Sequence, residues 1–348
     1  MNQDSNPRAP AAPAESTGQK HQACVLPDNG IYLNGGHPRR VKPVVVTLFE
    51  GDYHLGAAAL INSLCAAGFD GAVVCGHRGP VPPWAPAARQ LGPVQVDFVA
   101  LDTAVHLTNY KAEFLVHVWT ALHPGADRLF YFDPDIVVKV RWPFFEEWAD
   151  YGVALVEDVN SPMAESHPRR SAWRRCLGRR HQLVRRETSL YVNGGFIGLA
   201  RAQQGFLHEW REAMALVGGE IGGLERSMFS FDAVRPDMTS PDYPFSKTDQ
   251  DALNIAVMTA AQPVSIMGAE GMDFHPGGWT MSHALGPEKP WRKKFIRAAL
   301  AGRAPTAADR GFWAHAAAPL PVFPGRVLTW HRVTLACAGL IGRFYRRA

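Results

Sequence analysis

The sequence predicts an α/β fold with a mostly parallel sheet, and two patterns along its first half support this prediction. Apolar runs rich in β-branched residues recur between residues 43 and 159, as expected of buried parallel strands. Segments with helical apolar spacing separate several of these runs, and such alternation is typical of layered α/β proteins. The 348 residues are 47% hydrophobic and 20% charged, which is enough apolar material for one large domain or two ordinary ones.

The expected elements can be placed by their residue numbers. Strands are predicted at 41–50, 70–76, 94–101, 127–138 and 151–159, and helices at 56–69 and 110–122. A later strand, "SLYVNGGFIGLAR" (189–201), passes through a glycine pair. A further helix begins in "TDQDALNIAVM", where Thr248 is expected as the N-cap and Asp251 completes a capping-box-like arrangement.

The two ends of the chain differ in composition from the main domain, which is expected at 41–300. Residues 1–40 are polar and rich in Pro and Ala, which predicts a disordered leader without the apolar core of a secretory signal. The Pro/Gly-rich stretch around 302–326 predicts a linker, and 301–348 as a whole is expected to be linker and C-terminal helix. Scattered cysteines without a CxxC pair, and no run of roughly 18 apolar residues, predict a cytoplasmic protein.

The tail 326–348 holds five arginines and no acid, and its pattern predicts an amphipathic helix. Its apolar positions follow helical spacing and are Trp330, Thr334, Cys337, Ile341 and Phe344. Such a helix either lies in an anionic membrane interface or docks on the protein's own core, and the sequence leaves both alternatives open.

A second basic segment, 169–186, holds eight arginines and no acid, although the net charge of the chain is only +4. It is either a solvated, mobile loop or a surface that captures an anionic acceptor, such as a phosphorylated lipid-linked oligosaccharide. Nucleic acid is disfavoured as a partner because Trp173 is the one aromatic residue in the segment available for base stacking.

Asp133 and Asp135 lie within the predicted range 127–138, where its first apolar run ends, and parallel sheets bind their ligands beyond such strand ends. Side chains at i and i+2 of an extended segment point the same way, so this DxD pair can offer oxygens to one divalent cation. A solvated Asp-Pro-Asp turn is the alternative without function. An aspartyl-nucleophile phosphatase is another, but that motif normally opens its domain, whereas three predicted strands precede it here.

Four motifs occur in a suggestive order: "FDPDIVV" (132–138), "NGGF" (193–196), "TDQDALN" (248–254) and "HALGPEKPW" (283–291). Their order and spacing resemble retaining glycosyltransferases of the GT-A fold, most closely the glycogenin and bacterial lipopolysaccharide galactosyl- and glucosyltransferase family. The similarity covers about residues 43–296. It implies a Rossmann-like, mostly parallel sheet flanked by helices in the domain at 41–300.

The resemblance also implies roles for individual residues. Asp133, Asp135 and His283 would bind Mn²⁺ (or Mg²⁺), which bridges the donor diphosphate. Lys289 would hold the diphosphate and Gly286 would let the backbone approach it. Residues near the nucleoside of a UDP-sugar would be Thr47, Leu48 and Tyr53. Lys111 stands where the family usually has arginine, so it keeps the charge but lacks the bidentate fork.

The implied sugar pocket is lined by Asp158 (or Glu157), Asn193, Asp249 and Gln250. Gln250 corresponds to the amide near the anomeric carbon; because an amide is a poor nucleophile, the leaving phosphate would deprotonate the acceptor on the same face. A covalent glycosyl-enzyme is the alternative. The sequence departs from the family in the Gly194–Gly195 pair and in the arginine-rich segment, which lies where the family has its acceptor lid.

The combined prediction is a metal-dependent retaining glycosyltransferase that moves a hexose from a nucleotide sugar to a glycan or lipid-linked acceptor. Surface polysaccharide or lipopolysaccharide synthesis is the implied context, with the protein peripheral to the inner membrane. The rival functions are the aspartyl-nucleophile phosphatase and a non-catalytic relative that binds glycan or membrane.

Overall fold

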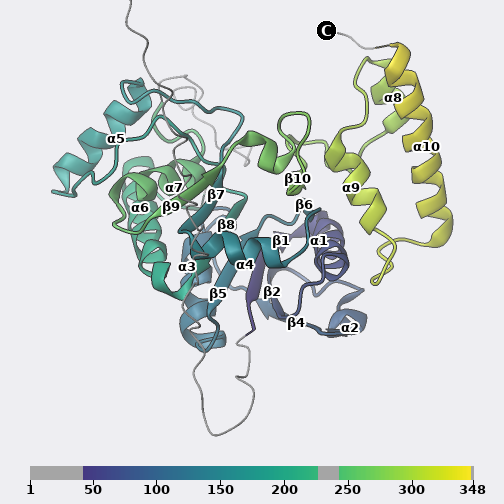
Figure 1. Ribbon diagram of the computed structural model, residues 1–348, viewed down its shortest axis with the longest axis horizontal. Helices are drawn as coiled ribbons and strands as arrows, with labels where there is room; N and C mark the ends of the chain where they lie inside the picture. Colours follow the sequence, from purple (N-terminus) through teal and green to yellow (C-terminus); the bar gives the residue numbers. More distant parts are fainter. Residues whose placement is uncertain (1–41, 226–242, 346–348) are drawn as a thin grey trace, which may run out of the picture. The chain divides into compact units, whose positions relative to one another are not determined.

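An eight-stranded sheet organises the residues that the computed structural model describes, which are 42–225 and 243–345 (Figure 1). The strands are β1 Val44–Glu50, β2 Ala72–Arg78, β3 Gln90–Leu91, β4 Val94–Ala100, β5 Arg128–Phe132, β7 Val153–Val156, β8 Phe196–Ala200 and β9 Val264–Met267. Their order across the sheet is β3–β4–β2–β1–β5–β8–β7–β9. The leader predicted at 1–40 lies outside the described residues.

The sheet is mostly parallel, as the sequence predicts. β4, β2, β1 and β5 run in one direction, with Val46 opposite Val74 on one side and Tyr131 on the other. β8 reverses the direction, because it pairs antiparallel with both β5 and β7, whereas β9 is parallel to β7. The carboxyl ends of β1, β2 and β5 therefore share one edge, and the DxD pair follows β5 at that edge.

Helices cover both faces of the sheet. They are α1 His54–Ala66, α2 Ala85–Ala88, α3 Lys111–His117, α4 Pro143–Asp150, α5 Pro168–Arg179, α6 Gly205–Ile221 and α7 Thr248–Thr259. The short helical turns are η1 Gly51–Tyr53, η2 Val118–Leu122, η3 Arg201–Gln203 and η6 Ala269–Met272.

Alternation along β1 separates the two cores. Val46 belongs to the cluster that α3, α6 and α7 complete, and Val45 belongs to the cluster that α1 and α4 complete. This period of two is the pleat of a strand that is buried on both faces.

Two expectations about element ends are wrong. The strand predicted at 189–201 begins only at Phe196, after the glycine pair. Lys247, not Thr248, is the N-cap of α7, and the Thr248 hydroxyl instead donates to Asn109 Oδ1. Asp251 still caps this helix end, because its Oδ2 accepts from the Lys247 backbone N–H at 2.8 Å.

A separate two-stranded ladder joins distant parts of the sequence. β6 (Ile136–Val138) pairs antiparallel with β10 (Met281–His283), and this register places His283 opposite Ile136. The pairing therefore brings a histidine to the DxD turn from almost 150 residues away in the sequence.

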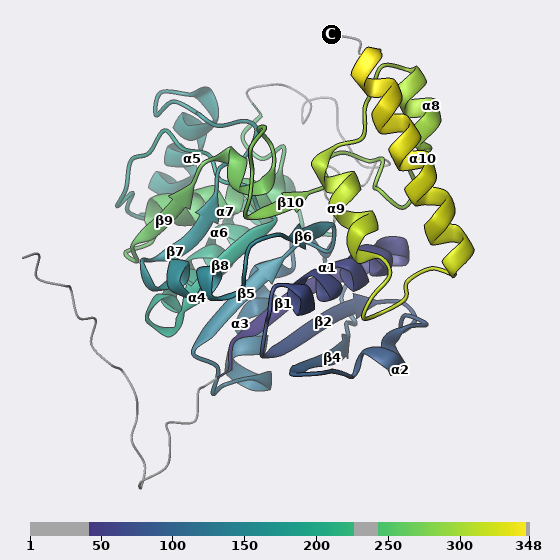
Figure 2. The same ribbon diagram turned by 45° about the vertical axis from the view of Figure 1, so that its right-hand side comes forward.

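The region expected as a linker contains a helix. α8 (Phe295–Leu300), α9 (Ala307–His315) and α10 (Gly325–Phe344) lie side by side in both views (Figures 1 and 2). A capping box between Thr306 and Asp309 starts α9. The buried Asn62 on α1 holds the following chain, since its amide donates to Leu320 O and His315 O and accepts from Leu320 N.

The docking alternative describes one face of α10, and the membrane alternative stays a prediction. One face docks through Ala338 and Gly342, while Trp330 and Phe344 are exposed on the other. Throughout the described ranges, no helix combines the length and the apolar character that a membrane crossing requires.

Candidate active site

The DxD turn is fixed by backbone hydrogen bonds from two other segments. Asp133 N donates to Gly195 O at 2.7 Å, and Ala284 N donates to Asp135 O at 3.1 Å. Within the turn, Ile136 N donates to Asp133 O at 3.1 Å. The turn, the glycine pair before β8 and the end of β10 are thereby locked together, which sets the positions of the side chains they carry.

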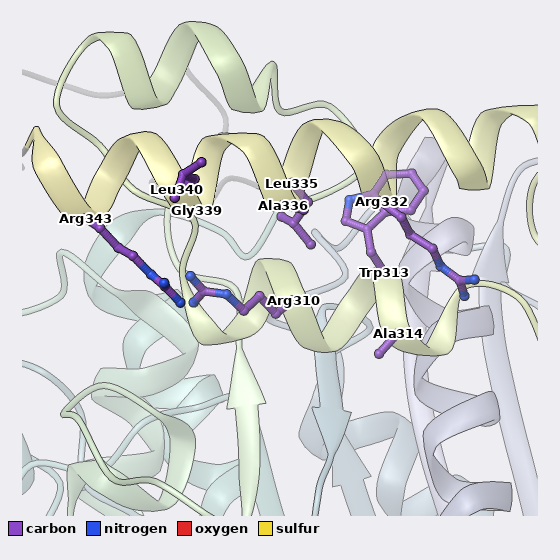
Figure 3. A pocket seen from close by; sticks show the side chains of 9 residues that line it. All are labelled: Arg310, Trp313, Ala314, Arg332, Leu335, Ala336, Gly339, Leu340 and Arg343. Carbon is purple, nitrogen blue, oxygen red and sulfur yellow. The ribbon is translucent and has the colours of Figure 1, made fainter.

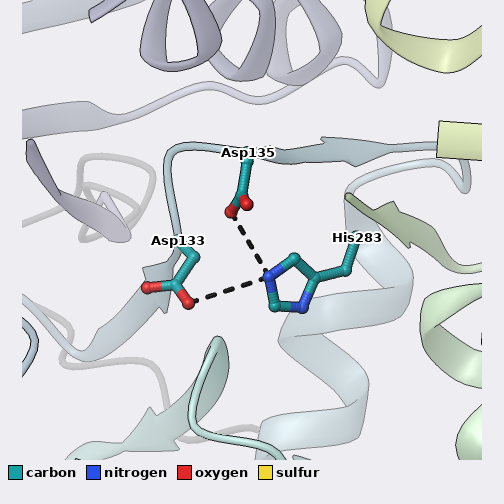
Figure 4. Close-up of side chains that lie close together, drawn as sticks. All are labelled: Asp133, Asp135 and His283. Atoms are coloured by element: carbon teal, nitrogen blue, oxygen red, sulfur yellow. Dashed lines mark ion pairs between the residues drawn. The ribbon is translucent and has the colours of Figure 1, made fainter. Parts of the chain in front are cut away.

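Asp133, Asp135 and His283 form a compact cluster of potential metal ligands (Figure 4). One ligand atom from each residue lies within 4.8 Å of the others. His283 Nε2 is 3.3 Å from Asp135 Oδ1 and 3.8 Å from Asp133 Oδ2. Two carboxylates with one imidazole are a donor set suited to Mn²⁺ or a similar divalent ion, so the residues present fit the metal that the sequence implies.

Two buried lysines already balance the charge of these carboxylates. Lys289 Nζ lies 2.5 Å from Asp135 Oδ2 and donates to Ala284 O at 2.7 Å. Burial alone would raise the pKa of Asp135, but the charges of Lys289 and His283 outweigh it and hold that pKa below its usual range.

Lys111 balances the charge of Asp133 in the same way. Its Nζ lies 2.9 Å from Asp133 Oδ1, 2.9 Å from Asp249 Oδ2 and 2.9 Å from Gly194 O. Burial lowers the pKa of this lysine, but the two carboxylates together raise it above its ordinary value. Lys111 is therefore a charged tie between the DxD turn and the start of α7.

The glycine pair lets β8 approach this cluster closely. A Cβ on Gly195 would lie 2.7 Å from His283 Cε1 and 3.0 Å from Asp133 Oδ2, and one on Gly194 would lie 3.1 Å from Asp249 Oδ2. Real Cβ atoms do not tolerate contacts below 3.0 Å. The departure from the family's usual pattern at Gly194 thus leaves additional room around Asp249.

The residues predicted to line a sugar pocket are joined by hydrogen bonds. Asn193 Nδ2 donates to Asp158 Oδ2 at 2.6 Å, and Asn193 Oδ1 accepts from Gly195 N at 2.8 Å. Gln250 Oε1 accepts from Gly194 N at 3.1 Å, and the Gln250 amide also lies beside the buried Tyr191 hydroxyl. These hydrogen bonds connect Asp158, Asn193 and Gln250 to the glycine pair.

The predicted nucleotide contacts divide into two groups. Tyr53 reaches the site, because its ring packs edge-on against Trp291 at 5.5 Å and lies 5.8 Å from Lys289 Nζ. Thr47 and Leu48 are buried within β1, and no described hydrogen bond, ion pair or ring contact joins them to the carboxylates. Gly286 has a φ of +82° in the exposed loop between β10 and Lys289.

Several contacts were missed by sequence reasoning. The Tyr131 hydroxyl donates to Asp133 Oδ1 at 2.7 Å; strand alternation from Asp133 back to position 131 could have identified it. Lys247 Nζ lies 3.3 Å from Asp158 Oδ1, and no pattern in the sequence pointed to that pair. Burial raises the pKa of Asp158, but Lys247 and the hydrogen bond from Asn193 lower it overall.

The arginine-rich segment is not a uniformly basic surface, because it folds into α5 and the loop after it. Arg170 is buried and donates to the carbonyls of Met163 and Leu190. Further along, Arg186 donates to Val257 O and Gln262 O. Two others are in ion pairs, Arg174 with Glu187 and Arg179 with Glu220. At least four of the eight arginines therefore have partners within the described residues, and the buried Arg170 contributes to the packing of this region.

Comparison with known proteins confirms the fold. No protein-family model matches the sequence, and no curated protein does. The apo structure of the bifunctional glycosyltransferase WbbM is similar at a TM-score of 0.50 and 17% identity, over 85% of this chain and 52% of that one. The chain thus spans about half the length of WbbM.

Two other structures are also similar. The galactosyltransferase LgtC, in complex with donor and acceptor sugar analogues, shares 16% identity over 84% of this chain and all of that one, at a TM-score of 0.46. The glycosyltransferase GlyE of Streptococcus pneumoniae shares 13% identity over 85% of this chain and 64% of that one, at a TM-score of 0.44. The likeness to WbbM shows that this chain has the predicted GT-A glycosyltransferase fold.

Proposed function

We propose that the protein is a metal-dependent, retaining glycosyltransferase that moves a hexose from a UDP-sugar to a glycan or lipid-linked acceptor. The observation that carries the proposal is the cluster of Asp133, Asp135 and His283 on a fold shared with a glycosyltransferase. Extension of a surface polysaccharide or lipopolysaccharide is the context that the sequence resemblance supplies.

The donor diphosphate would bind where the cluster and the lysines meet. Asp133, Asp135 and His283 would hold Mn²⁺ or Mg²⁺, which supplies positive charge to the departing diphosphate. Lys289 would contact the phosphates, with Gly286 allowing a close approach of its loop. The Tyr53 ring, beside Lys289, would lie against the nucleoside, and the unpartnered hydroxyl of Thr47 and the side chain of Leu48 would lie behind it.

The sugar would lie over the glycine pair, between Asp158 and Asn193 on one side and Asp249 on the other. Gln250 supports this placement, because it lies in the first turn of α7 next to Asp249 and its Oε1 accepts from Gly194 N of the glycine pair. Since an amide is a weak nucleophile, we favour reaction on one face, in which a leaving phosphate oxygen takes the acceptor's proton.

α10 would bring the enzyme to its acceptor. Its exposed apolar residues, together with the arginines of 326–348, support attachment to the anionic cytoplasmic surface of an inner membrane.

Thermal unfolding with nucleoside diphosphates and UDP-sugars, with and without Mn²⁺, tests the proposal. A ligand at a hundredfold excess over its dissociation constant stabilises the native state by roughly 2.7 kcal/mol. We expect a metal-dependent rise in Tm that Asp135→Ala abolishes and that the exposed control Asp70→Ala retains. No shift with any nucleotide would contradict the proposal. Release of phosphate from a phosphomonoester without a sugar donor would instead favour the phosphatase.

A further inference from the structure

A groove of about 600 Å³ runs between α9 and α10, and neither helix carries a residue of the candidate active site (Figure 3). Its lining combines three arginines with apolar side chains: Arg310, Arg332, Arg343, Trp313, Leu335 and Leu340. The groove therefore offers positive charge beside an apolar wall.

Among the residues that the structure describes, the three arginines have no acidic partner. Across residues 42–225 and 243–345, no carboxylate lies within ion-pair distance of Arg310, Arg332 or Arg343. In Figure 3 the side chains of Arg310 and Arg343 point toward one another. The Arg310 guanidinium lies against α10 at Gly339, where a Cβ would be 3.8 Å from Arg310 Nη2, an ordinary van der Waals distance. Like charges that converge repel unless an anion lies between them.

The groove adjoins an exposed apolar face of α10. The exposed fractions are 66% for Trp330, 52% for Val333, 56% for Leu340 and 85% for Phe344. These residues are spaced three, four or seven apart, so they share one side of the helix. Leu340 belongs both to this side and to the groove lining, which makes the basic and apolar surfaces continuous.

We propose that the groove binds the phosphate headgroup of an anionic phospholipid, with the acyl chains lying against the apolar face of α10. A free phosphate would satisfy the arginines but would leave the apolar face exposed to water. An amphiphile with a phosphate next to hydrocarbon matches both surfaces at once. This proposal goes beyond general attachment of α10 to a membrane, because it assigns a site with named residues.

Vesicle flotation of the full-length protein tests the site. Vesicles of phosphatidylcholine alone are compared with vesicles that also contain phosphatidylglycerol. The groove variant is Arg310→Gln/Arg343→Gln. The charge-matched control is Arg297→Gln/Arg326→Gln, which removes two exposed arginines of α8 and α10 that do not line the groove.

Diffuse attraction to anionic lipid predicts the same loss for both pairs, because each juxtamembrane arginine contributes similarly. The proposed site predicts that the groove variant loses about tenfold more affinity for the anionic vesicles than the control does. Equal losses, or no binding of the wild type, would overturn the proposal.

Two further measurements identify the ligand and separate this proposal from the transferase. Inorganic phosphate that raises the Tm of the wild type but not of the groove variant, without vesicle binding, would show a free-phosphate site and overturn the lipid assignment. Leu340→Gln/Phe344→Gln should weaken vesicle binding while leaving the arginines in place. The Mn²⁺-dependent nucleotide shift should be unchanged in every groove variant, so failure of one proposal leaves the other standing.

Discussion

Gly195, directly before β8, lies against the carboxylates and the imidazole, and its lack of a side chain has a measurable consequence. Gly195→Ala would place a Cβ 2.7 Å from His283 Cε1 and 3.0 Å from Asp133 Oδ2. We expect binding of Mn²⁺ with UDP to weaken by about tenfold or more, since a misplacement of the ligands by tenths of an ångström disturbs coordination. Isothermal titration calorimetry measures this affinity.

The matched control is Gly178→Ala, because a Cβ at Gly178 in α5 would meet nothing within 4 Å. It should leave the affinity unchanged and raise the free energy of unfolding by up to about 1 kcal/mol, as alanine favours helix over glycine. Equal binding by Gly195→Ala and wild type would contradict the role given to this glycine.

Asp251 makes stability depend on pH. Burial raises its pKa to about 7, although the Tyr191 hydroxyl and Lys247 N donate to its oxygens. Between about pH 4 and pH 7 the folded state therefore binds a proton that the unfolded chain has lost. The free energy of unfolding falls as pH rises through this window, by roughly 1.4 kcal/mol per pKa unit of difference.

Asp251→Asn cannot titrate, so its Tm should fall less than that of the wild type between about pH 4 and pH 7. The amide can accept from the Lys247 N–H through its oxygen and donate to the Tyr191 hydroxyl through Nδ2, so both hydrogen bonds have a replacement in the variant. Differential scanning fluorimetry across the pH series gives the slope. The same slope in both proteins would show that Asp251 does not titrate in this range.

That Asp133, Asp135 and His283 lie together could be predicted from the sequence, whereas the charges that surround them could not. The DxD spacing and the histidine motif pointed to Asp133, Asp135 and His283, which the structure brings together. The ties from Lys111 to Asp249 and from Lys247 to Asp158 join positions about 90 to 140 residues apart. Such pairs depend on how helices meet the sheet edge, which local spacing does not encode.

Among the elements, α9 shows how composition can conceal a helix. Prolines around 302–326 suggested a linker, yet Thr306 and Asp309 have the spacing of a capping box and start α9. The same stretch is attached to α1, since the buried Asn62 exchanges hydrogen bonds with Leu320 and His315.

Asn62→Ala should loosen this attachment. It leaves two buried backbone groups of Leu320 and the partly buried His315 O without these partners, and each buried unsatisfied group costs about 1–3 kcal/mol. We expect a loss of at least about 2 kcal/mol in the free energy of unfolding. Hydrogen exchange should rise across α9 and the segment to Leu320.

The exposed Gln90→Ala is the control, because it loses one solvent-accessible bond to Gly92 O and should change stability by less than about 0.5 kcal/mol. Unchanged hydrogen exchange near α9 in Asn62→Ala would show that the hydrogen bonds of Asn62 are not needed to hold this segment.

Over the whole molecule, the fold class and the parallel half of the sheet were predictable because the strands are long apolar runs. The reversal at β8 was not, since an antiparallel strand that is buried on both faces has the same composition as a parallel one. The sequence also did not show which arginines have partners in the folded protein. Arginines of α5 that looked free in the sequence bind carbonyls and acids, whereas those of the α9–α10 groove have no described acidic partner.

The ties that Lys111 and Lys289 make to the two aspartates imply a thermodynamic coupling between the ligands of the site. A divalent cation entering the cluster competes with both ammonium groups as counter-ion. A diphosphate that accepts the displaced ammonium groups removes this competition, so each ligand should raise the affinity of the other by the same factor.

Titration of Mn²⁺ with and without UDP measures that factor, for which we expect about tenfold or more. Lys289→Met should tighten Mn²⁺ binding in the absence of nucleotide and reduce the factor toward one. Arg303→Gln, which changes an exposed charge outside the cluster, should leave it unchanged. A factor of one in the wild type would mean that the lysines do not compete. With a factor of about tenfold or more, the proposed transferase would remain nearly metal-free until a nucleotide sugar arrives, and donor and cation would then act as a single cooperative ligand.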